Sequence, residues 1–149
     1  MKILLSVFFT IQISAGLANI DSVTRVDTID NWQIYLDLQH LLSGNSTYLY
    51  YERVSPLFSV EVSEQHTSLF IFFGGCPTGM DYYVEAVDEK DKNIGQFELS
   101  DEERIDGFPM AIPADLLREN IGRRIKFYQL DPKSKERKYL LIDLEILGD

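Results

Sequence analysis

The sequence predicts an all-β protein, built as a sandwich or barrel of eight or nine short strands. Apolar and polar side chains alternate with a period of two along much of the chain. Turn-forming residues interrupt it about every ten residues, which is the spacing of such folds. The chain also has 9 Phe and 8 Tyr, residues that suit a pleated surface.

The expected strands fall into two groups. In the first group, alternation places the apolar residues of each strand on its core-facing side. The four sets are Trp32, Ile34, Leu36 and Leu38; Phe58, Val60 and Val62; Phe97 and Leu99; and Leu140, Ile142, Leu144 and Ile146. In the second, aromatic and β-branched composition marks strands at 47–54, 68–73, 81–87 and 123–130. Turn formers occupy the positions between them, at 44–46, 55–56, 64–66, 74–79, 91–93 and 131–133.

One segment departs from this pattern and predicts a single short helix near 113–121. Pro113 stands at a first helical position, Asp115 lies in the first turn, and Gly122 is a stop signal.

The stretch IPADLLRENIG-RRIKFYQL at 112–130, followed by a hairpin and a final strand, is similar to the closing part of bacterial immunoglobulin-like domains. The hairpin YVEAVDEKDKNIGQFEL at 83–99 resembles such modules too. The resemblance implies an antiparallel immunoglobulin-like β-sandwich with a binding or structural role and no catalytic residues. The chain lacks the Cys-Trp-Cys spacing of antibody-type domains, and Trp32 lies in the first expected strand.

The N-terminus reads as a signal peptide covering residues 1–18. Lys2 precedes an apolar run from Ile3 to Ile13, and the small residues before Ala18 form a cleavage site. The run is too short to cross about 30 Å of hydrocarbon. Residues 19–149 then form a single domain in the periplasm or outside the cell, without a membrane span, because about 130 residues support one core.

The mature part is strongly acidic, with 13 basic and 24 acidic residues. This charge excludes nucleic acid as a partner and disfavours anionic membranes. Two blocks of opposite sign lie within it: residues 85–106 carry nine acids and three bases, and residues 118–138 carry eight bases and three acids. The blocks either pair across neighbouring strands or form two faces that steer a charged partner.

Candidate catalytic and metal residues are few. The one cysteine, Cys76, precludes an internal disulfide and has no base near it in the sequence, so a connecting loop is the better interpretation. His40 and His66 are too scattered for zinc. Residues 91–102 match a calcium loop only partly, because Gln96 replaces the required glycine. We therefore expect no cofactor and no metal site, while calcium binding at residues 91–102 and glycosylation at Asn45 both stay open.

The sequence favours an exported, non-catalytic binding or structural module whose partner is a protein. The candidate partner-binding residues are Tyr35 and Tyr83, together with Arg123 and Arg124 of the basic block. Each of the two tyrosines lies on the polar face of its own expected strand. One alternative is a periplasmic inhibitor or immunity protein for a basic toxin or wall-degrading enzyme. An alternative of another class is a hydrolase that uses Cys76 with a histidine.

We expect the mature protein to begin at Asn19, because signal peptidase cuts after small residues such as Ala18. N-terminal sequencing of the protein recovered from the periplasm or the medium measures this. A recovered chain that still begins at Met1 would contradict the prediction.

Overall fold

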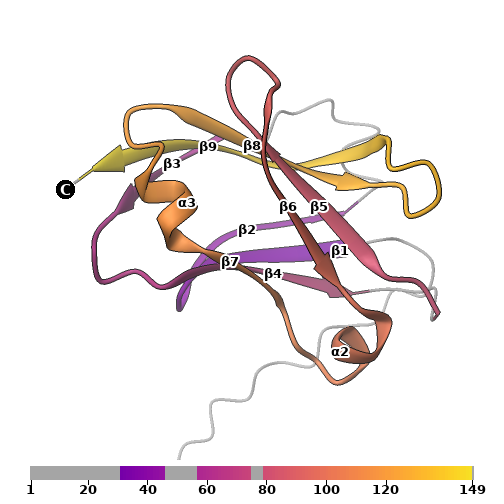
Figure 1. The fold of residues 1–149 in the computed structure, drawn as a ribbon. Coiled ribbons are helices and arrows are strands. Elements are labelled where there is room, and N and C mark those ends of the chain that lie inside the picture. The colour runs from indigo at the N-terminus through magenta and orange to yellow at the C-terminus, as the bar shows by residue number, and fades with distance from the viewer. Residues whose placement is uncertain (1–30, 46–56, 75–78, 149) are drawn as a thin grey trace, which may run out of the picture.

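The chain folds as an all-β sandwich in the computed structural model, which describes residues 31–45, 57–74 and 79–148. Two sheets face each other with a shared core between them (Figure 1). The described residues form nine strands and two short helices. The all-β, sandwich-like class predicted from the sequence is confirmed. The expected signal peptide, the strand at 47–54 and Cys76 lie outside the described residues.

The two sheets differ in size. The four-stranded sheet has the order β2-β1-β4-β7 and consists of β1 (Asn31–Leu36), β2 (Gln39–Asn45), β4 (Ser68–Gly74) and β7 (Met110–Pro113). The five-stranded sheet has the order β3-β9-β8-β5-β6 and consists of β3 (Leu57–Val62), β5 (Tyr82–Val87), β6 (Asn93–Leu99), β8 (Arg124–Leu130) and β9 (Arg137–Gly148). Neighbouring strands are antiparallel, except that β3 and β9 run parallel.

Alternating burial explains why the two sheets pack together. In β1, Trp32, Ile34 and Leu36 are buried and the residues between them are half-buried, as a strand with one inward face requires. The ring of Trp32 stacks on Tyr139 of β9, with ring centroids 6.3 Å apart. The first strand of one sheet is thereby joined to the last strand of the other.

The predicted inner face is wrong at Leu38. Its side chain is 97% exposed, because β1 ends at Leu36 and the chain reverses into β2 at Asp37, which has a φ of 49°. Period-two alternation holds only while a strand continues, so a turn residue such as Leu38 leaves the pattern.

The alternation predicted for β9 is right at one end of the strand and changes at the other. Ile142, Leu144 and Ile146 are buried, but Leu141 is buried as well and Leu140 is only half-buried. The register between β8 and β9 shifts twice within the hairpin, and each irregularity turns the following side chains to the other face.

The predicted short helix is present as α3 (Ala114–Arg118). It places Leu117 in the core, and Gly122, with a φ of 77°, ends the turn that follows it. Pro113 is the residue before the helix rather than its first residue. A second helix, α2 (Asp101–Ile105), was not predicted. Among the described residues, neither helix has the length and apolar run that crossing a membrane requires.

Asp37 connects the β1–β2 turn to the loop before β4. Its Oδ1 accepts hydrogen bonds from the Thr67 hydroxyl at 2.7 Å, the Thr67 amide at 3.1 Å and the Ser68 amide at 3.0 Å. The bond from Thr67 makes the largest contribution to lowering the pKa of Asp37. A carboxylate whose pKa is lowered by folding stabilises the fold above its unfolded pKa, and this contribution is lost as the pH falls through the folded pKa.

We expect Asp37→Asn to destabilise the fold by about 1 kcal/mol at neutral pH, the typical difference between charge-assisted and neutral hydrogen bonds. Asparagine tolerates the left-handed conformation, so backbone strain does not contribute. Urea denaturation of both proteins across pH measures the effect. The difference should disappear at acid pH, where Asp37 of the parent protein is protonated.

Glu61→Gln is the matched control, because Glu61 is an exposed carboxylate on the outer face of β3. It should change stability by less than about 0.5 kcal/mol. A pH-independent loss in Asp37→Asn would show that the carboxylate charge is not responsible.

Candidate functional site

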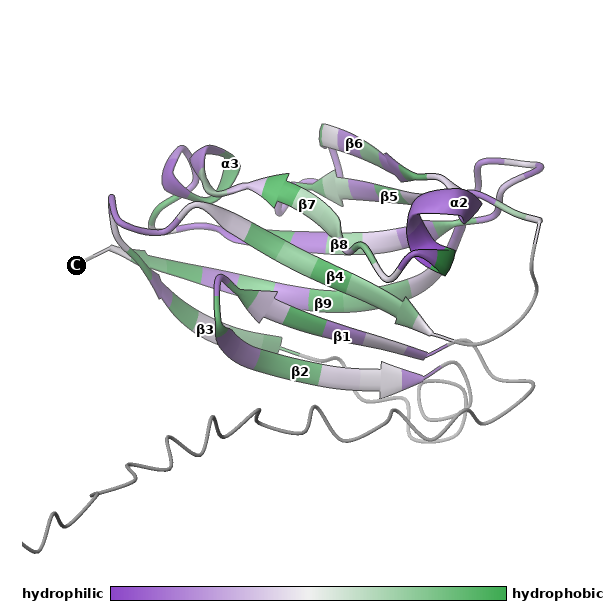
Figure 2. Cartoon of the chain, turned by 90° about the horizontal axis from the view of Figure 1, so that it is seen from below, coloured by the Kyte–Doolittle hydropathy of each residue, from purple (hydrophilic) through white to green (hydrophobic). Residues whose placement is uncertain are grey.

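The outer face of the four-stranded sheet carries no formal charge. None of the residues in β1, β2, β4 and β7 is Asp, Glu, Lys or Arg. Figure 2 looks onto this sheet, with β2, β1 and β4 toward the viewer. In a chain with 26% charged residues, a complete uncharged sheet is a departure from an ordinary solvated surface.

Aromatic side chains gather at the centre of this face, and we call Tyr35, Phe70 and Phe72 the aromatic face. Tyr35 and Phe70 are directly paired between β1 and β4, and the rings of Tyr35 and Phe72 meet edge to face at 5.6 Å. The side chain of Phe72 is 38% exposed. Such partly exposed aromatic rings are typical of protein interfaces.

Small and polar neighbours surround the aromatic face. The ring of His40 lies 5.0 Å from Tyr35, and the Tyr35 hydroxyl donates to Gln33 at 3.2 Å. Ala111 of β7 is paired with Phe70 and exposed. The rings are therefore held in place by neighbours and stay accessible from solvent, which lowers the entropy lost when a partner binds.

The outer face of the five-stranded sheet is charged, and there the two blocks of opposite sign meet. Arg137 of β9 donates to Glu85 of β5 at 2.8 Å and lies 5.0 Å from the ring centre of Tyr128. Lys126 of β8 approaches Asp91 of the β5–β6 turn at 3.3 Å. The two blocks therefore pair with each other at these residues, but not across neighbouring strands as expected, because β8 lies between β9 and β5 and Asp91 belongs to a turn.

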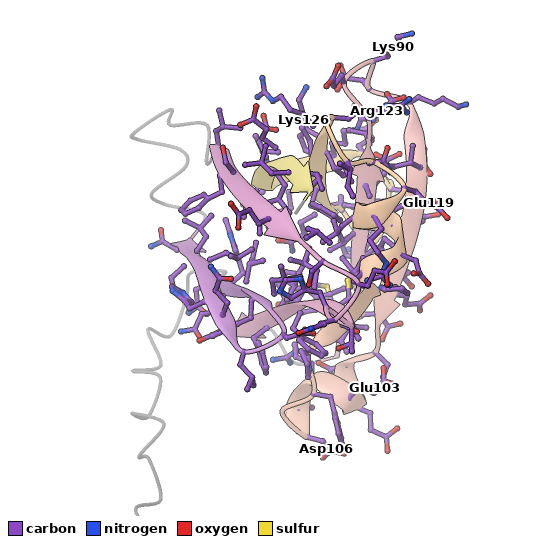
Figure 3. All side chains as sticks on the ribbon, turned by 90° about the vertical axis from the view of Figure 1, so that its left-hand side faces the viewer. Lys90, Glu103, Asp106, Glu119, Arg123 and Lys126 are labelled. Atoms are coloured by element: carbon purple, nitrogen blue, oxygen red, sulfur yellow. The ribbon has the colours of Figure 1, made fainter. Side chains whose placement is uncertain are left out.

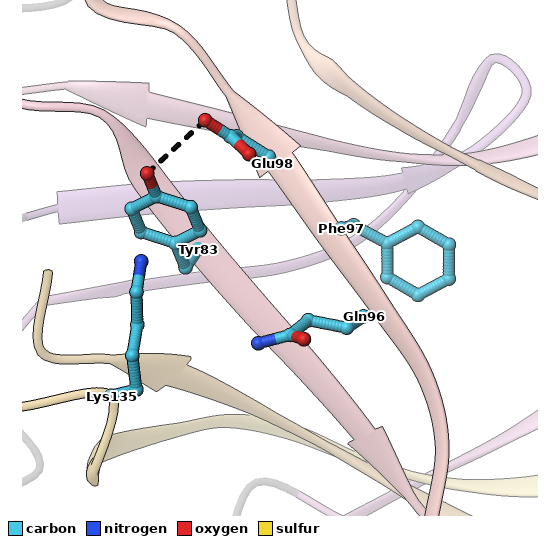
Figure 4. Close-up of a pocket in the computed structure, with 5 residues that line it drawn as sticks. All are labelled: Tyr83, Gln96, Phe97, Glu98 and Lys135. Carbon is cyan, nitrogen blue, oxygen red and sulfur yellow. Dashed lines mark hydrogen bonds between the residues drawn. The ribbon is translucent and has the colours of Figure 1, made fainter.

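Tyr83 lies on this charged face, at a shallow pocket of about 240 Å³ lined by Tyr83, Gln96, Phe97, Glu98 and Lys135 (Figure 4). Its hydroxyl donates to Glu98 at 3.1 Å, and the Lys135 ammonium lies 2.7 Å from the centre of its ring. The hydrogen bond to Glu98 raises the pKa of Tyr83. The hydroxyl and one ring face are thus engaged within the chain.

Arg124 and Arg123 lie at the other end of β8 from the residue paired with Tyr83. Arg124 forms an ion pair with Asp143, whose side chain is only 2% exposed. Asp143 lies between the core residues Ile142 and Leu144 of β9, where alternation favours the outer face, but it is buried. The exposed Arg123 precedes β8, and its amide donates to Asn120 at 3.0 Å.

The four predicted partner-binding residues therefore do not form one surface. Tyr35 lies on the uncharged sheet. Tyr83 lies beside the last residue of β8 in the other sheet, and Arg123 and Arg124 lie at the start of β8. Sequence reasoning missed Phe70 and Phe72, although the run LFIFF placed two aromatic residues on the face opposite the core.

The candidate catalytic and metal groups are engaged locally where the structure describes them. His40 bonds to Ser43 at 2.9 Å, and His66 Nδ1 accepts from the Ser63 amide at 3.0 Å. Asp91, in the β5–β6 turn, forms an ion pair with Lys126 of β8. Within the described ranges, no three side chains of His, Cys, Asp or Glu are grouped closely enough to hold a metal ion.

The chain matches none of the protein-family models, no curated protein and no solved structure. The function must accordingly be argued from the surfaces described above.

We expect Glu98→Gln to lower the pKa of Tyr83, because the amide no longer favours the protonated phenol as the carboxylate does. Ring signals of isotope-labelled tyrosine, followed by NMR across alkaline pH, measure the change. Tyr83→Phe assigns the signal, and Glu61→Gln is the control that should leave it in place. An unchanged titration in Glu98→Gln would disprove the contact.

Proposed function

We propose that this chain is an exported, non-catalytic protein-binding module with an immunoglobulin-like β-sandwich. The aromatic face, formed by Tyr35, Phe70 and Phe72, is the surface that binds the partner. The observation that carries the proposal is the placement of an exposed ring, Phe72, beside the half-buried rings of Tyr35 and Phe70 on a sheet without a formal charge.

The strand order supports the immunoglobulin-like assignment. In that fold, consecutive strands cross between two sheets in a Greek key, and the third, sixth and seventh strands lie together. We count β1, β4, β5, β6 and β7 as strands A, B, C, C′ and E, β8 as F and β9 as G. One sheet then has the order β2-A-B-E, with β2 as an additional edge strand, and the other has the order β3-G-F-C-C′. Strand β3, parallel to β9, takes the place of the second half of a divided first strand.

The chemistry of the partner follows from the surface. A partner surface with strong charge would lose hydration against this sheet without gaining an opposite charge. The partner therefore presents an uncharged, largely apolar surface to the aromatic face, and the contact is insensitive to salt.

The histidines support a non-catalytic role. A nucleophile requires a base within hydrogen-bond reach, and His40 and His66 are each bonded to a serine of their own turn or hairpin. In a catalytic set a third side chain orients the base, and within the described residues the side-chain hydrogen bonds of both imidazoles go only to these serines. The export component of the proposal rests on the N-terminal pattern of residues 1–18.

Site-specific photocrosslinking tests the proposal. A photoreactive phenylalanine analogue replaces Phe72, and the protein is irradiated in cells of its source organism. We expect one dominant crosslinked protein at position 72, identified by mass spectrometry. The same analogue at Gln96, which is exposed on the outer face of β6, is the control.

The proposal also predicts the effect of a charge on this face. Phe72→Glu should abolish the crosslink formed by an analogue placed at Tyr35, and Gln96→Glu should not. The thermal transition should change little in either variant, because both positions lie on outer faces. Identical crosslinking patterns at positions 72 and 96, or none at either, would refute the proposed role.

A further inference from the structure

A second surface stands apart from both sheets, at the segment between β6 and β7. We call residues 100–109, which contain α2, the acidic tip. Ile105 is 61% exposed and Phe108 is 60% exposed, although both are large apolar side chains. Glu102, Glu103 and Asp106 around them are exposed as well. Two apolar side chains framed by carboxylates occupy this part of the surface.

Charge at the acidic tip is not balanced by the tip itself. Its one basic residue, Arg104, pairs with Asp101 at 2.6 Å. No ion pair among the described residues involves Glu102, Glu103 or Asp106. Figure 3 shows Glu103 and Asp106 at one end of the molecule and Lys90, Arg123 and Lys126 at the other. The acidic tip therefore keeps a local excess of negative charge.

The start of the acidic tip is held by a reciprocal cap. Ser100 accepts from the Glu103 amide at 3.3 Å, and Glu103 accepts from the Ser100 amide at 3.1 Å. The Asp101 carboxylate accepts from the Gly79 amide at 2.6 Å. These bonds fix the first turn to the body of the domain.

The end of the acidic tip is fixed by backbone bonds. The Asp106 amide donates to the Glu102 carbonyl at 3.0 Å, and the Phe108 amide donates to the Glu103 carbonyl at 2.9 Å. Gly107 supplies the left-handed conformation between them, with a φ of 86°. The backbone that carries Ile105 and Phe108 is consequently fixed while their side chains are exposed, so little backbone freedom remains to be lost on binding.

Arg104 anchors the acidic tip to the core. Its guanidinium lies 5.6 Å from the ring centre of Tyr82, and that ring stacks on Phe73 with centroids 4.6 Å apart. The side chain of Arg104 is only 9% exposed. The single positive charge of the tip is thus withdrawn from the surface that a partner would meet.

We propose that the acidic tip is a docking element for a basic protein whose surface contains an apolar recess that receives Ile105 and Phe108. Exposed apolar anchors surrounded by charges of one sign are the arrangement of an interface centre with a polar rim. The net charge of −10 adds long-range attraction for a cationic partner. This inference goes beyond the proposed function, because the aromatic face is uncharged and its contact does not depend on salt.

A display library of random cyclic peptides is the probe for this surface. The library is selected on the immobilised parent protein and counter-selected on the double variant Ile105→Ser/Phe108→Ser. We expect the surviving peptides to carry net positive charge together with apolar residues. Their affinity for the double variant should fall at least about tenfold, the usual effect of removing interface anchors.

Charge variants test the electrostatic part separately. Glu102→Gln/Asp106→Asn should slow association and remove most of its salt dependence, because rim charges act mainly on the association rate. Ile121→Ser is the matched control, since Ile121 is 48% exposed and follows α3, away from the tip. It should leave affinity within about twofold of the parent value.

Three results would overturn the inference. They are a selection in which no peptide survives counter-selection, survivors without net positive charge, and survivors whose affinity falls equally in Ile121→Ser. Thermal denaturation of each variant verifies folding, which these exposed positions should leave intact. Crosslinking at Phe72 is independent of the outcome, so failure here and failure of the proposed function are distinguishable.

Discussion

The burial of one face of each sheet is the constraint on which the rest of this structure depends. Trp32, Ile34 and Leu36 of β1 meet Ile142, Leu144 and Ile146 of β9 within one core, without a disulfide to support it in a chain with one cysteine. Because alternation commits every second side chain to this core, only the outer faces and the connections are available for binding.

The two outer faces differ in charge and therefore in hydration. On the five-stranded sheet, Arg137, Glu85, Lys126 and Asp91 neutralise one another, and such exposed pairs contribute little stability but keep the surface hydrated. On the four-stranded sheet there is no charge to hydrate, and Phe72 remains exposed. This asymmetry distinguishes the aromatic face from an ordinary solvated surface and gives its contacts a different salt dependence from those of the acidic tip.

The connections are held more firmly than their exposure suggests. Asp37 fixes the β1–β2 turn to Thr67, and the capping box of Ser100 and Glu103 fixes α2. In each case a carboxylate accepts from a hydroxyl, of Thr67 or of Ser100, and from backbone amides; the hydroxyl contributes most to lowering the pKa of Asp37 and of Glu103. These segments are thus predicted to hold their geometry at neutral pH and to lose part of that support on acidification.

The sequence by itself determined the all-β class, most strand positions and the helix at α3, because alternation, turn residues and glycine stops act over a few residues. The Ser100–Glu103 capping signature is equally local and indicates the start of α2, which the sequence analysis missed. The tertiary structure alone decided the rest. Strand pairing brings Tyr35 beside Phe70 and Arg124 to the buried Asp143, and no periodicity within a strand specifies which distant strand will lie next to it.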